Sequence, residues 1–147
     1  MARTEKNQSE VLVIEPEPLS RQYVVQALQN LALLLHVKTS FSEIQGQRSS
    51  TGTRLVILGL DVDAGDNLSR LEQAQKHCPG AVIMGICPRV EPAARIALLD
   101  AGLDFIIEKP FFVEECVSAV QAILRRLEQH QTYPLKPASE VGDLDEA

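Results

Sequence analysis

Five short apolar runs alternate with segments of helical periodicity, and this alternation constrains the fold more than any other feature of the chain. Each run has five to seven residues, which suits a strand buried on both faces. The alternation predicts an α/β fold, a doubly wound parallel sheet in the flavodoxin-like order 2-1-3-4-5 with helices on both faces. The predicted strands are residues 10–14, 34–39, 54–60, 81–86 and 103–107.

Helices are predicted between these strands. The first begins at Pro18, because proline fits the first turn of a helix and the prolines of the EPEP segment stop the preceding strand. A weak second helix is predicted from Ser40, and residues 45–52 and 61–67 are predicted to be loops. Three further helices are predicted at residues 68–77, 91–101 and 111–129.

Length and composition predict one domain with loose ends. The chain has 147 residues, of which 45% are hydrophobic, and this suits one core with little room for another. Residues 10–129 are predicted to form the domain. Residues 1–9 are predicted to be flexible, and residues 130–147 are predicted to be a flexible acidic tail.

Charge and apolar content predict a cytoplasmic protein with no direct contact to nucleic acid or membrane. The net charge is −6, and no run rich in Lys and Arg stands out. No apolar run approaches the about 20 residues of a membrane-spanning helix, and the polar N-terminus does not resemble a signal peptide. Cys78, Cys87 and Cys116 lack the spacing of a zinc site and are predicted to be small buried residues.

Candidate functional residues follow the strands. In open α/β sheets the functional crevice lies beyond the carboxyl ends of the strands. Those ends carry Glu15 and Glu17, then Gly59 with Asp61 and Asp63, then Ile86 and Cys87, and finally Lys109.

Two stretches of the sequence resemble the receiver domain of response regulators. VLVIEPEPLSRQYVVQAL resembles the opening of that family, and AGLD at 101–104 with KPF at 109–111 resembles its ending. The resemblance covers residues 11 to 126 and implies a CheY-like fold. In that family an acidic pair binds Mg²⁺, an aspartate accepts a phosphoryl group, and a lysine neutralises the transferring oxygens. A hydroxyl after the fourth strand and an aromatic on the fifth complete the set.

The acidic pair and the acceptor of that pattern are altered here. The pair falls on Glu15 and Pro16, and proline offers no side-chain ligand. The acceptor position falls on Gly59, which has no nucleophile. The loop GLDVDAGDN also resembles the equivalent loop of pseudo-receivers with alanine at the acceptor position.

The remaining positions of the pattern are altered except one. The hydroxyl position falls on Ile86, or on Cys87 if the strand is shifted by one residue, and neither carries a hydroxyl. The aromatic position falls on Ile106, with Phe105 beside it, and only Lys109 is kept. The resemblance therefore predicts a degenerate pseudo-receiver. It would be non-enzymatic, hold no cofactor, and act by protein contact in signalling, independently of aspartyl phosphorylation.

Three alternatives stay open. Asp61 lies roughly 6–7 Å beyond Gly59 in an extended chain and is the alternative phosphoacceptor. Glu15, Glu17 and Asp61, with Asp63, are weak candidates for a metal site, and another ligand could switch the domain. A small nucleotide-binding enzyme or hydrolase would need a glycine-rich phosphate loop after the first strand, where this chain has EPEP.

The altered crevice raises two structural expectations. Lys109 is expected to pair with Glu15 or with Asp61. The room left by Gly59 is expected to be filled by Leu60 or by Ile86, which would act as an apolar plug and hold the domain in one conformation.

A protein partner is expected on the face made by the fourth helix, the fifth strand and the fifth helix, because receivers commonly use it. A homodimer through the same face is also expected. Phe111 and Phe112 either both lie buried between helix and sheet, the more ordinary alternative, or one of them is exposed at the interface. The candidate interface residues are Arg95, Leu99, Phe105, Ile106, Phe111, Phe112 and Val113.

Overall fold

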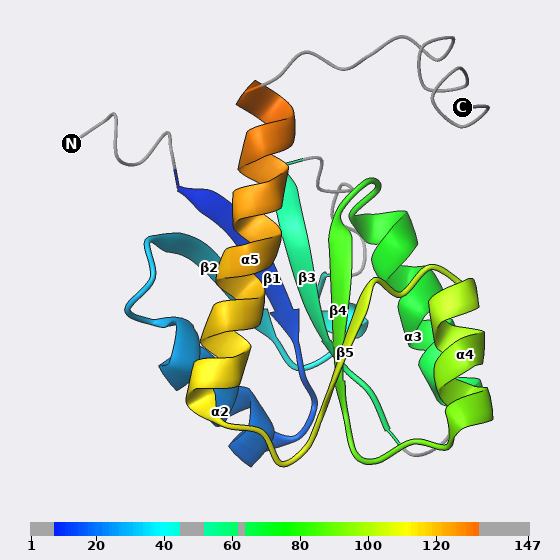
Figure 1. Ribbon diagram of the computed structural model, residues 1–147. Helices are drawn as coiled ribbons and strands as arrows, with labels where there is room; N and C mark the ends of the chain where they lie inside the picture. Colours follow the sequence, from blue (N-terminus) through cyan, green and yellow to red (C-terminus); the bar gives the residue numbers. More distant parts are fainter. Residues whose placement is uncertain (1–7, 45–51, 62–63, 133–147) are drawn as a thin grey trace, which may run out of the picture.

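A computed structural model describes residues 8–44, 52–61 and 64–132 of the chain. Five parallel strands form one sheet in the order β2-β1-β3-β4-β5, which confirms the predicted topology (Figure 1). The strands are β1 (Ser9–Ile14), β2 (Leu33–Lys38), β3 (Thr53–Gly59), β4 (Val82–Cys87) and β5 (Phe105–Glu108).

Helices cover the two faces of this sheet. α2 (Pro18–Leu28) and α5 (Val113–Thr132) pack together on one face, and α3 (Ala64–His77) and α4 (Pro92–Asp100) pack together on the other (Figure 1). The crossover from β2 to β3 carries a short 3₁₀ helix, η1 (Phe41–Ile44). The molecule is therefore a three-layer sandwich with two separate apolar layers.

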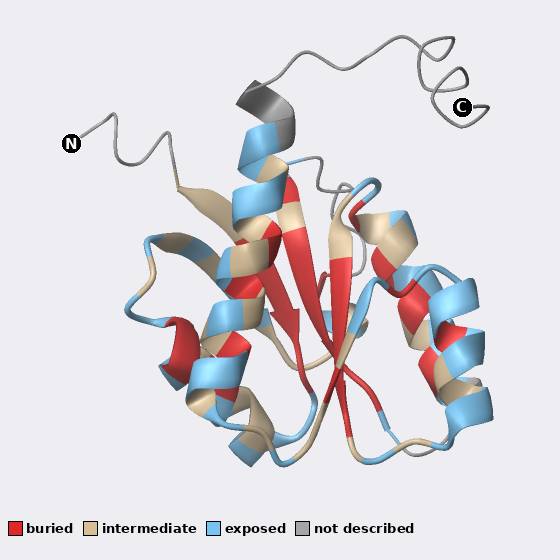
Figure 2. Ribbon diagram, in the orientation of Figure 1, coloured by how far each residue is buried: buried red, intermediate tan, exposed pale blue. Residues whose placement is uncertain are grey.

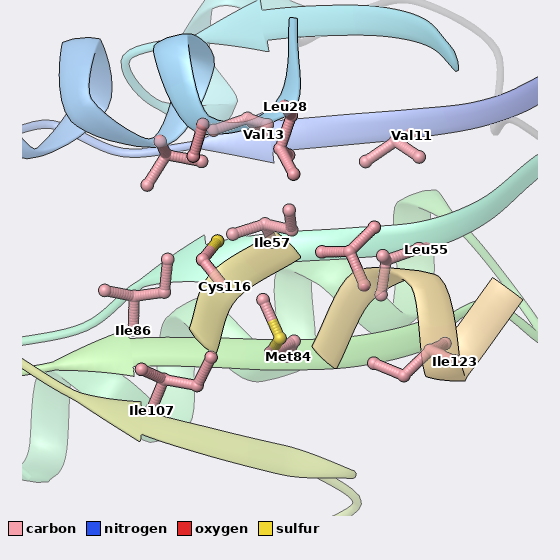
Figure 3. Packing of buried hydrophobic residues seen from close by; sticks show 13 residues of the cluster. Val11, Val13, Leu28, Leu55, Ile57, Met84, Ile86, Ile107, Cys116 and Ile123 are labelled. Carbon is pink, nitrogen blue, oxygen red and sulfur yellow. The ribbon is translucent and has the colours of Figure 1, made fainter. Parts of the chain in front are cut away.

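The central strands are buried on both faces, and Figure 2 shows them as the most buried part of the molecule. Alternate side chains of a strand point to opposite faces of the sheet. Val13, Ile57 and Met84 pack toward α2 and α5, in the cluster that Figure 3 shows. Leu58 and Ile83 pack toward α3 and α4. This double burial is why these strands read as unbroken apolar runs in the sequence.

Two predicted elements differ from the structure. α3 begins at Ala64, so the loop predicted for residues 61–67 is wrong in its second half. The helix predicted from Ser40 is only the four-residue η1, because Phe41 and Ile44 alone supply apolar contacts there. Both errors have the same cause, a weak periodic signal. The start of α3 is polar and contains a glycine, and η1 has only two apolar residues.

Several predicted segments lie at the limits of the described chain. β1 already begins at Ser9, and α5 continues to Thr132. The remaining predicted ends, and residues 45–51 of the predicted loop, lie outside the described residues. Among the residues described, no helix is both long and apolar enough to cross a lipid bilayer.

Candidate functional site

Four predicted residues come together at the carboxyl edge of the sheet. Gly59 ends β3 and is paired in register with Ile86, which in turn is paired with Ile107 of β5. Glu15 directly follows β1, and Lys109 directly follows β5. Residues two apart along a strand point to the same face of the sheet. Because Val13, Ile57 and Ile107 face α2 and α5, the positions Glu15, Gly59 and Lys109 lie on that face too. Ile86 belongs to the same cluster.

Glu15 is the buried charge of this crevice, with only 3% of its surface exposed. Its Oε1 lies 3.1 Å from Lys109 Nζ and accepts a hydrogen bond from Ser20 Oγ at 2.7 Å. Its Oε2 accepts a hydrogen bond from the Glu17 backbone N–H at 3.2 Å. A buried carboxylate is stable only when it is paired and hydrogen-bonded, and these contacts supply both. Glu15 is thus the first of the two partners predicted for Lys109.

The Glu15 carboxylate occupies the space in front of Gly59. A Cβ atom built on Gly59 would lie 2.5 Å from Glu15 Cδ and 2.9 Å from its Oε1, and closer still to Oε2. No side chain fits there while Glu15 keeps this position. The expectation that Leu60 or Ile86 fills the room left by the glycine is therefore wrong, because a charged side chain from the neighbouring strand fills it.

The loop between β1 and α2 holds Glu15 in this position. Glu17 caps α2, its carboxylate accepting hydrogen bonds from the backbone N–H groups of Leu19 at 2.7 Å and Ser20 at 3.1 Å. The helix begins at Pro18 as predicted, and Glu17 is used by the helix end. Arg21 Nη1 donates to the carbonyl oxygens of Glu15 at 2.9 Å and of Pro16 at 3.2 Å.

Ile86 and Cys87 lie on opposite faces of the sheet, and both are fully buried. Ile86 shares the face of Gly59 and belongs to the same cluster as Ile107 and Cys116 (Figure 3). The hydroxyl position of the receiver pattern is therefore occupied by an apolar side chain on the crevice face. Cys87 packs toward α4, where burial raises the pKa of its thiol above the ordinary value.

Asp61 is exposed and follows β3 by two residues. Its backbone is held by Asn67, which was not predicted: Asp61 N–H donates to Asn67 Oδ1 at 2.7 Å, and Asn67 Nδ2 donates to the Asp61 carbonyl at 2.6 Å. Asn67 is almost completely buried. Asn67 lies in the first turn of α3, in a polar stretch whose sequence does not reveal which side chain is buried.

The crevice does not fit the magnesium ion of the receiver pattern. Pro16 and Gly59 offer no side-chain ligand, the Glu15 carboxylate is held by Lys109, and the Glu17 carboxylate caps α2. Within the part of the chain that the structure describes, no three His, Cys, Asp or Glu side chains are grouped so that they could hold a metal ion. Asp63, the fourth candidate ligand, lies outside the described residues.

A second unpredicted residue, Arg70 of α3, contacts the other side of Gly59. Arg70 Nη1 donates to the Gly59 carbonyl at 2.9 Å, and Nη2 pairs with Asp66 Oδ2 at 3.0 Å. Gly59 is thus contacted by Glu15 on one face of the sheet and by Arg70 on the other. Asp66 and Arg70 are spaced like an ordinary ion pair on an exposed helix face, so Arg70 does not stand out in the sequence.

The candidate interface residues are spread over α4, β5 and the start of α5. Leu99 and Phe105 are exposed, and so is Ile96 of α4, which was not predicted. Arg95 pairs with Glu108, which joins α4 to the edge strand β5. Ile106 and Val113 are half-buried against the two core layers.

The two consecutive phenylalanines differ in exposure. Phe111 is half-buried, with its ring 5.3 Å from that of Tyr23 in an edge-to-face contact, and its carbonyl accepts a hydrogen bond from Tyr23 Oη at 2.9 Å. Phe112 is 78% exposed. The alternative in which both are buried is wrong, because the side chains of consecutive residues at a helix start diverge.

No family model matches the chain. Among curated proteins, it is 28% identical over 137 residues to the transcriptional regulatory protein TrcR of Mycobacterium tuberculosis. That match covers 91% of this chain and 52% of TrcR. The chain spans about half the length of the curated relatives it matches.

Solved structures share the fold at lower identity. A CheY-like response regulator receiver domain protein from Methanospirillum hungatei superposes with a TM-score of 0.69 at 18% identity, covering 84% of this chain and 98% of that protein. A CpaE2 pilus assembly protein from Sinorhizobium meliloti, described in its structure as putative, superposes with a TM-score of 0.64 at 22% identity. It covers 78% of this chain and 98% of the other. The chain therefore has the CheY-like fold, and the proteins it resembles include response regulators.

Proposed function

We propose that this chain is a receiver-like interaction module that works by protein contact and independently of aspartyl phosphorylation. The observation that carries the proposal is the Glu15 carboxylate in front of Gly59. It fills the place from which an acceptor side chain would project, and it already neutralises Lys109. Phosphoryl transfer depends on in-line positioning and on a free cation at the transferring oxygens, whereas the space in front of Gly59 is filled by Glu15 and Lys109 is already paired.

The ion pair also supports a module held in one conformation. Lys109 comes from the end of β5 and Glu15 from the end of β1, so the pair closes the crevice across the sheet. Ile86 packs on the same face, so the hydroxyl position of the receiver pattern offers a new phosphate no polar side chain. A partner would then recognise a permanent surface instead of a phosphorylation-dependent one.

The proposed partner is a protein, bound through the α4, β5 and α5 face. The relatives are transcriptional regulatory proteins, and one structural neighbour is described as a pilus assembly protein. Both support a role in regulation or in positioning a larger assembly. The exposed apolar side chains of Leu99, Phe105 and Phe112 are the contacts we assign to that partner.

Intact-protein mass spectrometry tests the proposal directly. The full chain is incubated with acetyl phosphate and Mg²⁺, beside an active CheY-like receiver that proves the donor competent. We expect no mass gain for this chain. A gain of one phosphoryl group would overturn the proposal, and its loss in Asp61→Asn would assign the acceptor to Asp61, as in an atypical response regulator.

A further inference from the structure

A second cavity opens on the opposite face of the sheet from Glu15 and Lys109. It has a volume of about 400 Å³ and lies between the ends of β1, β2 and β3 and the first half of α3. In the order 2-1-3-4-5 the chain leaves β1 toward α2 on one face and β3 toward α3 on the other, which opens a crevice between the ends of β1 and β3. Open α/β sheets bind small ligands at this switch point. A volume of several hundred Å³ is the usual size of a small-molecule site.

One wall of the cavity is a polar stripe of α3. Asp66, Ser69, Arg70 and Gln73 line it, at the spacing i, i+3, i+4 and i+7 that places side chains on one face of a helix. They supply a carboxylate, a hydroxyl, a guanidinium and an amide. The guanidinium of Arg70 has more N–H donors than its contacts with Asp66 and the Gly59 carbonyl use.

The other lining residues of the cavity differ in chemistry from the polar stripe of α3. Thr39 and Ser40, which follow β2, bring hydroxyl groups, and Phe41 brings a half-buried aromatic ring. Ile14 and Pro16 add apolar surface at the end of β1. The cavity thus combines apolar lining residues with a wall of hydrogen-bonding groups.

We propose that this cavity binds a nucleoside, with its base against Phe41 and its ribose hydroxyls against Asp66 and Gln73. Aromatic side chains can stack on any of the nucleic-acid bases. An acidic side chain commonly accepts hydrogen bonds from ribose hydroxyls. The single cation and single carboxylate of the lining are already paired, so the lining favours an uncharged ligand over a phosphate anion. This proposal does not depend on the proposed function, since it concerns the other face of the sheet.

The cavity borders the crevice that holds Glu15. Arg70 holds the carbonyl of Gly59, and the Glu15 carboxylate lies against the same glycine from the other face. The cavity and the crevice that holds Glu15 therefore share Gly59 as a common wall.

An amide NMR titration of the full chain tests the site. Adenosine, guanosine, cytidine and uridine are the probes, with ribose, adenine and adenosine monophosphate as separate arms. We expect saturable shifts at the amides of Phe41, Gly59 and residues 66–73 with at least one nucleoside. Removal of a ligand hydrogen bond in Gln73→Leu should weaken binding about tenfold.

Matched variants decide the outcome. Glu72→Gln changes an exposed neighbour outside the cavity and should bind as the native chain does. Ser69→Ala serves as a second test, and the dispersion of each spectrum reports whether the variant is folded. The proposal is overturned if no nucleoside gives saturable shifts, if ribose or adenosine monophosphate binds as well as the nucleoside, or if Gln73→Leu and Ser69→Ala both bind unchanged.

Discussion

At the scale of single residues, the crevice contains a carboxylate paired with a lysine, as the receiver pattern does. The carboxylate in front of Gly59 comes from Glu15 at the end of β1 and not from position 59 at the end of β3. Glu15 reaches the place in front of Gly59 because glutamate is longer than aspartate and glycine leaves the space open. Both residues were identified from the sequence as altered positions. Their mutual contact was not, because it depends on where a flexible carboxylate turns, which hydrogen bonds from Ser20 and Glu17 decide.

The contact between Glu15 and Gly59 predicts that substitutions at the two positions have non-additive effects on the free energy of unfolding. Gly59→Ala should lower the free energy of unfolding by about 1–3 kcal/mol, because the new Cβ displaces a buried, hydrogen-bonded carboxylate. In a Glu15→Ala background the same substitution should cost much less. Urea unfolding of the four proteins of this cycle measures the coupling, and equal costs in both backgrounds would contradict it.

At the scale of elements, the strand order and the element types were predicted from the alternation of apolar runs and are confirmed. Errors fell where periodicity is weak, at η1 and at the start of α3. The first turn of α3 contains Asn67, whose side-chain amide supplies hydrogen-bond partners to the backbone N–H and carbonyl of Asp61. Hydrophobic periodicity indicates which face of a helix or strand is buried. It does not indicate which single side chain forms a hydrogen bond such as that of Asn67.

The Asn67 clamp should be essential to the connection between β3 and α3. Asn67→Ala removes two short hydrogen bonds at a buried position and should cost about 1–3 kcal/mol of unfolding free energy. Amide hydrogen exchange at Asp61 should accelerate in the same variant. Asn67→Asp keeps the acceptor for the Asp61 N–H but sets a buried carboxylate against the Asp61 carbonyl, so it should destabilise at least as much as Asn67→Ala. Unchanged exchange in Asn67→Ala would rule the clamp out.

At the scale of the whole molecule, the two apolar layers hold three buried thiols. Burial raises the pKa of Cys116 from its ordinary value of 9.0 to about 11. The unfolded chain loses this proton first, so the stabilising contribution is complete below pH 9.0 and is lost as the pH rises to about 11. Unfolding free energies of the native chain and Cys116→Ala across this range should converge as pH rises. A constant difference would disprove the linkage.

The exposed surface predicts how the molecule associates. Replacing Leu99 and Phe105 together by serine should reduce concentration-dependent self-association with little loss of stability, because both side chains are exposed. Leu34→Ser is the control, since Leu34 is similarly exposed but lies on β2 at the other edge of the sheet. Sedimentation velocity measures the effect. A native chain that stays monomeric at every concentration would exclude the homodimer.

The placement of Glu15 against Gly59 also limits which substitutions the protein can accept at position 59. A single change of Gly59 to aspartate would place two carboxylates in one buried space, which both steric overlap and charge repulsion oppose. An acceptor side chain at position 59 would first require a shorter side chain at position 15, and that intermediate would leave Lys109 without its carboxylate partner Glu15. Each single substitution thus lowers the free energy of unfolding, so the present pair opposes the gain of an acceptor at position 59.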